Sequence, residues 1–273
     1  MDEDHPKVIR LSYEGRVAVI TIDNPTKLNA LSLFQYYDLA SKMREVAARD
    51  DVYVTLLTGT GRFFSAGADV SVASSDNGSD AYAHWLRSFV AFNLNIARAF
   101  YTHPKVLVVG LNGPAVGLSA ALIGFADFVY CTPETFLLTP FSSLGLVAEG
   151  GASVGLVQRL GRAKALEALL MSRRIPSDEL LAAGFVNAVF SGPDTANDTA
   201  FHRRVRAEID ARLGPHLIGD SLLGIKKLVR AADDHVLDRQ NVAEVFAGLD
   251  RFLTGVPQEE FRKLATGEKR HKL

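Results

Sequence analysis

The sequence contains one cysteine, almost no net charge and no long apolar run, and each shortage excludes a class of protein. The single cysteine, Cys131, rules out a framework of internal disulfides, and its apolar surroundings predict a small core residue. A net charge of −1 provides no basic field for nucleic acid or an anionic membrane. No run approaches the ~20 apolar residues of a membrane span. The seven histidines are scattered, so we expect no metal site.

Apolar residues are abundant, at 48% of the 273 residues, which is enough to bury a large core. Runs of β-branched residues predict strands early in the chain, and helical spacing dominates after Gly150. We therefore predict a core domain over 1–195 and a helical region over 196–273. Segment 73–81 is rich in Ser, Asp, Asn and Gly and predicts a loop. The predicted strands are 8–13, 17–22, 52–57, 106–110, 128–130, 135–138 and 185–190; the predicted helices are 33–49, 83–101, 154–160, 164–171, 177–183, 200–213, 222–231, 241–253 and 259–264.

Two glycine-bearing turns, about fifty residues apart, are the most informative feature of the sequence. Residues 61–69 and 112–121 each follow a β-branched apolar run. A strand that ends in such a turn and opens a helix points free backbone N–H groups into a pocket. With Gly67 and Gly117 shaping the turns, the exposed donors would be the amides of Ala68 and Leu118, which together could hold one developing negative charge. Neither turn matches a phosphate-binding or dinucleotide-binding loop, and a single turn of this kind is common.

Three motifs occur in a specific order along the chain. They are Asn24-Pro25 with Leu28-Asn29-Ala30-Leu31, then Phe64-Ser65-Ala66-Gly67-Ala68-Asp69, then Asn112-Gly113-Pro114-Ala115-Val116-Gly117. Together they resemble the enoyl-CoA hydratase/isomerase (crotonase) family. The resemblance implies an α/β fold, a crotonase-like spiral of β-β-α turns with a C-terminal helical trimerisation region, assembled as a homotrimer or hexamer. It also implies a fatty enoyl-CoA ligand whose thioester oxygen binds the Ala68 and Leu118 amides. Coenzyme A would be part of the substrate, so we expect no separate cofactor.

The carboxylates decide which reaction of the family to expect. Hydratases of this family use two glutamates, and here the corresponding positions hold Ala121 and Phe141, so hydration is not expected. Glu149 remains, in Leu144-Gly145-Leu146-Val147-Ala148-Glu149-Gly150-Gly151. It is either a catalytic base or a structural charge at a helix start, which contributes ~0.3–1 kcal/mol. Burial should raise the pKa of Glu149 and the helix start should oppose this, and the sequence leaves the balance open.

The stretch around Glu149 is similar to that of peroxisomal Δ3,Δ2-enoyl-CoA isomerases, in which this Glu is the base. That similarity implies an enzyme that moves a 3-enoyl-CoA double bond to the 2-trans position in fatty acid beta-oxidation. Glu149 would take a proton from C2 and return it at C4. Three alternatives stay open: a dienoyl-CoA isomerase, which would need a second acidic residue upstream that Phe141 and its neighbours do not provide; a thioesterase; and a non-catalytic acyl-CoA-binding protein.

The remaining candidate residues surround these motifs. Asn93 would orient Glu149 or a water, unless it is exposed or bonded to the backbone. Phe141 and Leu144 would line an acyl tunnel, unless they only pack the core. Asp69 would order its own turn. The substrate-binding candidates are thus Ala66, Gly67, Asp69, Gly117, Asn93, Phe141, Leu144, Lys27 and Arg62; Lys226, Lys227 and Lys263 are further candidate partners of the coenzyme A phosphates, and solvated surface charge is the alternative for all these cations.

The last three residues suggest where the protein resides. His271-Lys272-Leu273 is similar to the peroxisomal address of small residue, basic residue and leucine, although His271 departs from the small first residue. A frayed basic tail is the alternative. We predict recognition by a peroxisomal import receptor and a location in the peroxisomal matrix, with a cytoplasmic pool as a further option.

Overall fold

A six-stranded sheet forms the first layer of the fold. The computed structural model describes residues 7–69 and 80–270, and the sheet has the order β1-β2-β3-β4-β6-β9. Only β1 runs antiparallel to its neighbour; the other pairs are parallel. The bounds are β1 Ile9–Glu14, β2 Val17–Ile22, β3 Val54–Gly59, β4 Val106–Leu111, β6 Phe128–Cys131 and β9 Ala188–Val189. Both β3 and β4 are buried along their whole length, as expected of parallel strands covered on both faces.

The strand predictions hold for the early strands and fail near residue 185. Cys131, at the end of β6, is fully buried, which confirms it as a core residue. The predicted strand 185–190 shrinks to β9, because Phe185 and Val186 donate backbone hydrogen bonds back to Leu180 and bury their side chains in the turn after a helix. A second, small sheet has the order β5-β7-β8, with β5 Ala115–Val116, β7 Phe136–Leu138 and β8 Ile175–Pro176.

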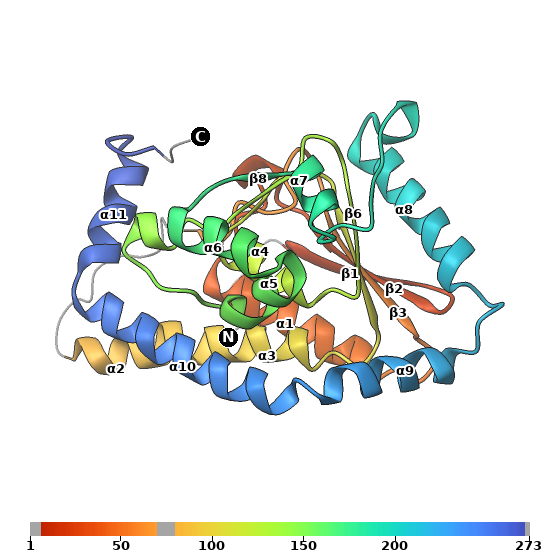
Figure 1. The fold of residues 1–273 in the computed structure, drawn as a ribbon, viewed down its shortest axis with the longest axis horizontal. Helices are drawn as coiled ribbons and strands as arrows, with labels where there is room; N and C mark the ends of the chain where they lie inside the picture. Colours follow the sequence, from red (N-terminus) through yellow and green to blue (C-terminus); the bar gives the residue numbers. More distant parts are fainter. Residues whose placement is uncertain (1–6, 70–79, 271–273) are drawn as a thin grey trace.

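Helix α1 contacts β1 of the large sheet, α3 packs against α1, and α2 lies beside α10 (Figure 1). Helix α1 (Leu33–Ala47) begins with a capping box: Ser32 accepts from the Gln35 amide, and the Gln35 side chain accepts from the Ser32 amide. The predicted helix 83–101 is instead α2 (Ala81–Trp85), a π-helical turn (Leu86–Val90) and α3 (Ala91–Tyr101). The predicted loop 73–81 lies largely outside the described residues. The later helices are α4 Gly117–Leu122, α5 Ala152–Leu160, α6 Arg162–Met171 and α7 Ser177–Ala182.

Four helices complete the chain: α8 Asp198–Leu213, α9 Gly219–Ala231, α10 Asp234–Leu253 and α11 Val256–Ala265. Helix α10 starts seven residues before the predicted position and runs beside α2 and α3 (Figure 1). Helix α8 packs Phe201, Val205 and Ile209 against β3 and β4 in a second apolar core. The fold is thus mixed α/β with a C-terminal helical region, as predicted. The boundary near residue 195 and the role of the helices in trimerisation stay predictions.

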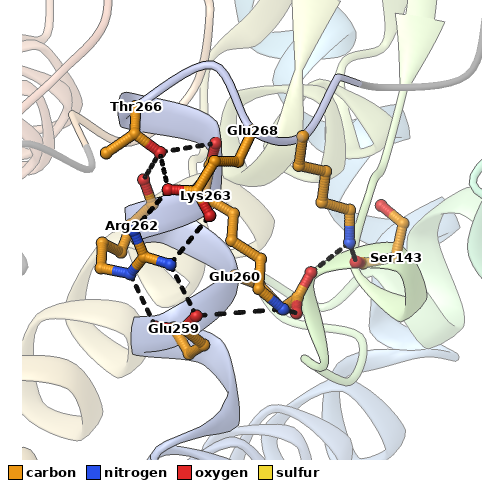
Figure 2. Close-up of polar contacts among 8 residues, drawn as sticks. Ser143, Glu259, Glu260, Arg262, Lys263, Thr266 and Glu268 are labelled. Carbon is orange, nitrogen blue, oxygen red and sulfur yellow. Dashed lines mark hydrogen bonds and ion pairs between the residues drawn. The ribbon is translucent and has the colours of Figure 1, made fainter.

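The end of the described chain is fixed by a polar network on α11 (Figure 2). Arg262 bonds to Glu259 and Glu268, while Glu260 accepts from Lys263. Lys269 bonds to Glu260 and to the backbone carbonyl of Ser143, in the short 3-10 turn Ser142–Leu144. These contacts hold α11 beside the segment that leads to Glu149.

Candidate active site

The two glycine turns meet in space, as the sequence predicts. Gly67 and Gly117 both have positive φ, at 91° and 60°, which glycine adopts without strain. An isolated bridge pairs Ser65 with Ala115, and the Val116 amide donates to the Ser65 carbonyl. A Cβ added to Gly67 would lie 2.8 Å from the Val116 carbonyl oxygen. The two backbones therefore approach too closely for any other residue at position 67.

The local backbone pairing leaves the amides of Ala68 and Leu118 outside its hydrogen bonds. The Leu31 amide donates to the Gly67 carbonyl, and the Leu31 carbonyl accepts from the Asp69 amide. Because backbone N–H groups alternate in direction along an extended strand, the Ala68 N–H points away from Leu31. Leu118 lies in the first turn of α4, where N–H groups lack an intrahelical acceptor. Both residues line one cavity. Among the backbone hydrogen bonds of residues 7–69 and 80–270 outside regular helices and strands, none is donated by either N–H.

A buried chain of hydroxyl groups supports these turns, and the sequence analysis missed it. Ser119 Oγ lies 2.8 Å from both Tyr36 Oη and Ser65 Oγ. Ser65 Oγ also donates to the Asn29 carbonyl and accepts from the Gly67 amide. Burial raises the pKa of Tyr36, so its hydroxyl stays neutral. The sequence signal was a serine next to each donor turn, which single-sequence patterns do not distinguish from ordinary turn serines.

Glu149 precedes α5 and lies against the second donor turn. Gly150 follows it with φ of 68°, and a Cβ there would lie 2.6 Å from Leu118 Cδ1 and 3.2 Å from Ala121 Cβ. Ala121, at the position where the family resemblance implies the first hydratase glutamate, is fully buried. The Glu149 turn thus packs directly over Ala121.

Asn93 of α3 holds the Glu149 carboxylate. Its Nδ2 donates to Glu149 Oε2 at 2.7 Å, and its Oδ1 accepts from the Gly150 amide at 3.2 Å. Asn93 is only 4% exposed. The structure therefore excludes an exposed Asn93 and shows that it bonds both to the Glu149 carboxylate and to the Gly150 backbone; its role as an orienting residue stays a prediction.

The surroundings of Glu149 favour a base that titrates near neutrality. Burial, and after it the nearby charge of Glu244, raise the pKa of Glu149 to about 7, although the Asn93 bond acts in the opposite direction. Glu244 comes from α10 and was missed by the sequence analysis. The sequence signal for Glu244 was a carboxylate at helical spacing from apolar residues. The buried positions of α10 near it are Leu237, Asn241, Glu244, Val245 and Gly248.

The cavity shared by Glu149 and the two amides has a volume of about 280 Å³. Its walls are largely apolar and come from α1, α2, the π-helical turn, α3, α10 and α11. The described titratable residues that line it are Tyr36, Asp69, His84 and Glu149. Asp69 also pairs with Lys27 at 2.9 Å, which links the first and second sequence motifs at the cavity. The full lining is Leu31, Leu33, Tyr36, Ala68, Asp69, His84, Trp85, Ser88, Phe89, Phe92, Asn93, Ile96, Leu118, Leu146, Glu149, Phe252 and Phe261.

Both predicted tunnel residues lie elsewhere. Phe141 belongs to the main core, and Leu144 is buried in the 3-10 turn; neither is among the described residues that line the cavity. The apolar wall is built instead by Leu146 and by aromatic rings from α2, the π-helical turn, α10 and α11. Trp85 stacks on Phe252 with centroids 4.3 Å apart. Ala66, Gly67 and Gly117 shape the donor turns rather than the cavity wall.

Several candidate cations already have partners. The Lys226 ammonium bonds to Asp127 and to the Lys105 carbonyl, and its side chain is 9% exposed. Lys263 pairs with Glu260. Arg62 is exposed beside a separate groove, and Lys227 is exposed on α9. Lys27 pairs with Asp69, which lines the cavity. The assignment of any of these cations to the coenzyme A phosphates stays a prediction.

The described part of the chain contains neither a cluster of metal-binding side chains nor a membrane-spanning helix. Residues 7–69 and 80–270 include no group of three or more His, Cys, Asp or Glu side chains arranged to hold a metal ion. In the same ranges, no helix combines the length and apolarity needed to cross a membrane.

Comparison with known proteins places the chain in a family. The model of the enoyl-CoA hydratase/isomerase family matches residues 12–209. A Δ(3,5)-Δ(2,4)-dienoyl-CoA isomerase of Pyricularia oryzae is 65% identical over 97% of this chain and 99% of the relative. A 3,2-trans-enoyl-CoA isomerase of Saccharomyces cerevisiae is 35% identical over 97% of each. The mouse protein named peroxisomal enoyl-CoA delta isomerase 3 is 30% identical over 94% of this chain and 76% of the relative.

Solved structures give the same answer for the fold. The crystal structure of an enoyl-CoA hydratase/isomerase from Pseudoalteromonas atlantica superimposes with a TM-score of 0.82 at 24% identity, covering 98% of this chain and all of that one. This likeness shows the crotonase fold. The chain belongs to the enoyl-CoA hydratase/isomerase family, and its similarity to named isomerases supports an enoyl-CoA isomerase.

Proposed function

We propose that this protein isomerises 3-enoyl-CoA to 2-trans-enoyl-CoA in fatty acid beta-oxidation, with Glu149 as the base. The observation that carries the proposal is one cavity that holds the Glu149 carboxylate, oriented by Asn93, together with the Ala68 and Leu118 amides. Ala121 and Phe141 stand at the two positions where hydratases of this family carry glutamate. Neither side chain is acidic, so neither can activate water for addition.

The mechanism follows from this arrangement. The thioester carbonyl accepts hydrogen bonds from Ala68 and Leu118, which makes the C2 proton more acidic. Glu149 removes that proton, and the negative charge of the dienolate moves to the oxygen between the two amides. Protonated Glu149 then returns the proton at C4, so the C3=C4 bond becomes C2=C3. A pKa of about 7 lets one group serve as base and then as acid.

A second candidate is the isomerisation of 3,5-dienoyl-CoA to 2,4-dienoyl-CoA, which the name of the 65% identical relative favours. The proton must then travel from C2 to C6, beyond the reach of a base fixed at C2 and C4. His84 and Asp69 also line the cavity and offer a second proton-carrying group. This reaction would use the same Glu149 step at C2.

The experiment that tests the proposal compares both substrates with the purified protein. We expect turnover of 3-enoyl-CoA, measured with a series of acyl chain lengths. Turnover of 3,5-dienoyl-CoA alone would replace the first candidate by the second. If the protein binds both substrates tightly and turns over neither, it is an acyl-CoA-binding protein. Release of free coenzyme A from either substrate would indicate a thioesterase.

Assembly and location belong to the same proposal. The family resemblance supports a homotrimer or a hexamer, and the peroxisomal name of the mouse relative supports a peroxisomal matrix location. The tail His271-Lys272-Leu273, proposed as the import address, lies outside the described residues.

A further inference from the structure

The helix that follows Glu149 is capped from a distant part of the chain. Glu244 of α10 accepts from the Gly151 amide through Oε2 at 2.7 Å and from the Ser153 amide through Oε1 at 2.8 Å. Glu244 is 5% exposed. Each of its oxygens thus receives one backbone N–H, and these bonds favour the ionised carboxylate, whereas burial has the larger effect and raises the pKa of Glu244.

This cap occupies donors that would otherwise act on Glu149. The N-terminus of a helix stabilises negative charge, and Glu149 stands two residues before Gly151, the N-cap of α5. Yet the Glu149 carboxylate accepts from Asn93, whereas the free N–H groups of α5 point to Glu244. The next amides are also used, because Gly150 donates to Asn93 and Ala152 donates to the Glu149 carbonyl.

We propose that Glu244 is a positioning residue for Glu149: by taking the N–H groups that begin α5, it fixes the Gly150-Gly151 turn and keeps the base free of helix donors and facing the cavity. This inference deepens the proposed function and rests on it. It also gives α10 a role in the active site, because α10 packs against both α3, which carries Asn93, and α5.

Other charged or titratable groups around Glu149 are accounted for. Tyr36 of α1 bonds to Ser119, His84 of α2 packs edge-on against Trp85, and Asp69 pairs with Lys27. Arg251, seven residues after Glu244 on α10, donates to the Gly145 carbonyl. Helix α4 contributes the apolar Leu118, and α11 contributes the apolar Phe261. Glu244 is the group whose charge adds to burial in raising the pKa of Glu149.

The sign of the expected effect follows from charge. A negative neighbour disfavours the ionised form of Glu149 and raises its pKa. Replacing Glu244 by neutral glutamine removes this repulsion and frees a helix donor. Both changes lower the pKa of Glu149, so its titration moves to lower pH by about one unit. A weaker base also removes the C2 proton more slowly, so kcat at high pH should fall while KM stays nearly constant.

The test titrates Glu149 itself in the full-length protein. Side-chain carboxyl ¹³C resonances are followed against pH, with the Glu149 signal assigned by its loss in Glu149→Gln. The Glu244→Gln midpoint should lie below that of the wild type. The matched control is Asn241→Ala, one turn earlier on α10, which removes the bond to the Leu94 carbonyl without changing charge. Its midpoint should equal the wild-type value. Glu244→Met, which is neutral and of similar length, replaces Glu244→Gln if the latter does not fold.

The outcomes separate this inference from the proposed function. An unchanged Glu149 midpoint in Glu244→Gln, with only a lower melting temperature, would overturn the inference and leave Glu244 as a purely structural cap. The same pH shift in the Asn241→Ala control would also overturn it. A shifted midpoint in a protein that does not turn over 3-enoyl-CoA would refute the proposed reaction while upholding the role of Glu244.

Discussion

The two halves of the site are built in different ways. The amide half is local: positive φ at Gly67 and Gly117 and the ends of neighbouring strands place the Ala68 and Leu118 donors. The carboxylate half is assembled from distant segments, because Asn93 of α3 and Glu244 of α10 hold Glu149 and its turn. The amide half should therefore be sensitive to backbone changes, and the carboxylate half to single side-chain substitutions.

The largest expected effect comes from removing the base. Glu149→Gln keeps the size of the side chain and loses the proton acceptor, so we expect kcat for 3-enoyl-CoA to fall by about 10²–10⁴-fold. Binding of a saturated acyl-CoA should remain within a few-fold of wild type, measured by calorimetry. Wild-type turnover in this variant would show that another group removes the C2 proton.

The next effect tests the backbone half. In Gly67→Ala, the new methyl would stand 2.8 Å from the Val116 carbonyl at a φ of 91°, so the turn must shift and the Ala68 donor with it. Loss of one such donor lowers kcat by about 10²–10³-fold. The control is Gly224→Ala on α9, where a Cβ meets nothing within 4 Å; it should leave kcat unchanged. Full activity in Gly67→Ala would contradict the assignment of the Ala68 amide.

A smaller effect is expected at the residue that orients the base. Asn93→Ala removes a hydrogen bond to the Glu149 carboxylate, and we expect a loss of roughly tenfold or more in kcat. Because this bond favours the ionised form, its loss should raise the pKa of Glu149 and move the acidic limb of the rate profile to higher pH. Asn95→Ala, two residues along α3 and bonded to Arg44, is the control that should change neither quantity.

The last effect concerns stability rather than rate. Glu149 has a pKa raised from 4.5 to about 7 in the folded protein, so the folded state binds its proton more tightly than the unfolded chain does. This contribution is fully present below pH 4.5 and is lost as the pH rises through 7. Glu149→Gln should therefore gain stability over wild type between pH 5 and 8, reaching on the order of 2 kcal/mol. Urea unfolding across this range measures it, and a constant difference would argue against a buried, strained carboxylate.

The difference between the halves explains what the sequence could predict. The donor turns were predictable because Gly67, Ala68 and Leu118 follow strand signals and glycine geometry within a few residues. The capped start of α1 at Ser32 was predictable for the same local reason. Glu149 was identified through its family resemblance and its Gly150-Gly151 context, and the structure brings it to the same cavity as both amides.

Features that depend on packing between distant segments were not predictable. Glu244 and Trp85 reach the site through contacts of α10 and α2, which helical spacing alone cannot register. For Phe141 and Leu144 the sequence left a tunnel wall and core packing open; both are buried outside the cavity lining, and Leu146 lines the wall. The predicted strand 185–190 was too long, because Phe185 and Val186 bury their side chains in the core from a turn rather than from a strand.

The pH dependence of the wild-type reaction tests the central claim most directly. If one buried carboxylate with a pKa of about 7 removes the C2 proton, kcat/KM for 3-enoyl-CoA should rise tenfold per pH unit on the acidic side and level off above a midpoint near 7. A profile that is flat from pH 5 to 9, or whose midpoint lies near the ordinary value of a glutamate, would contradict the account.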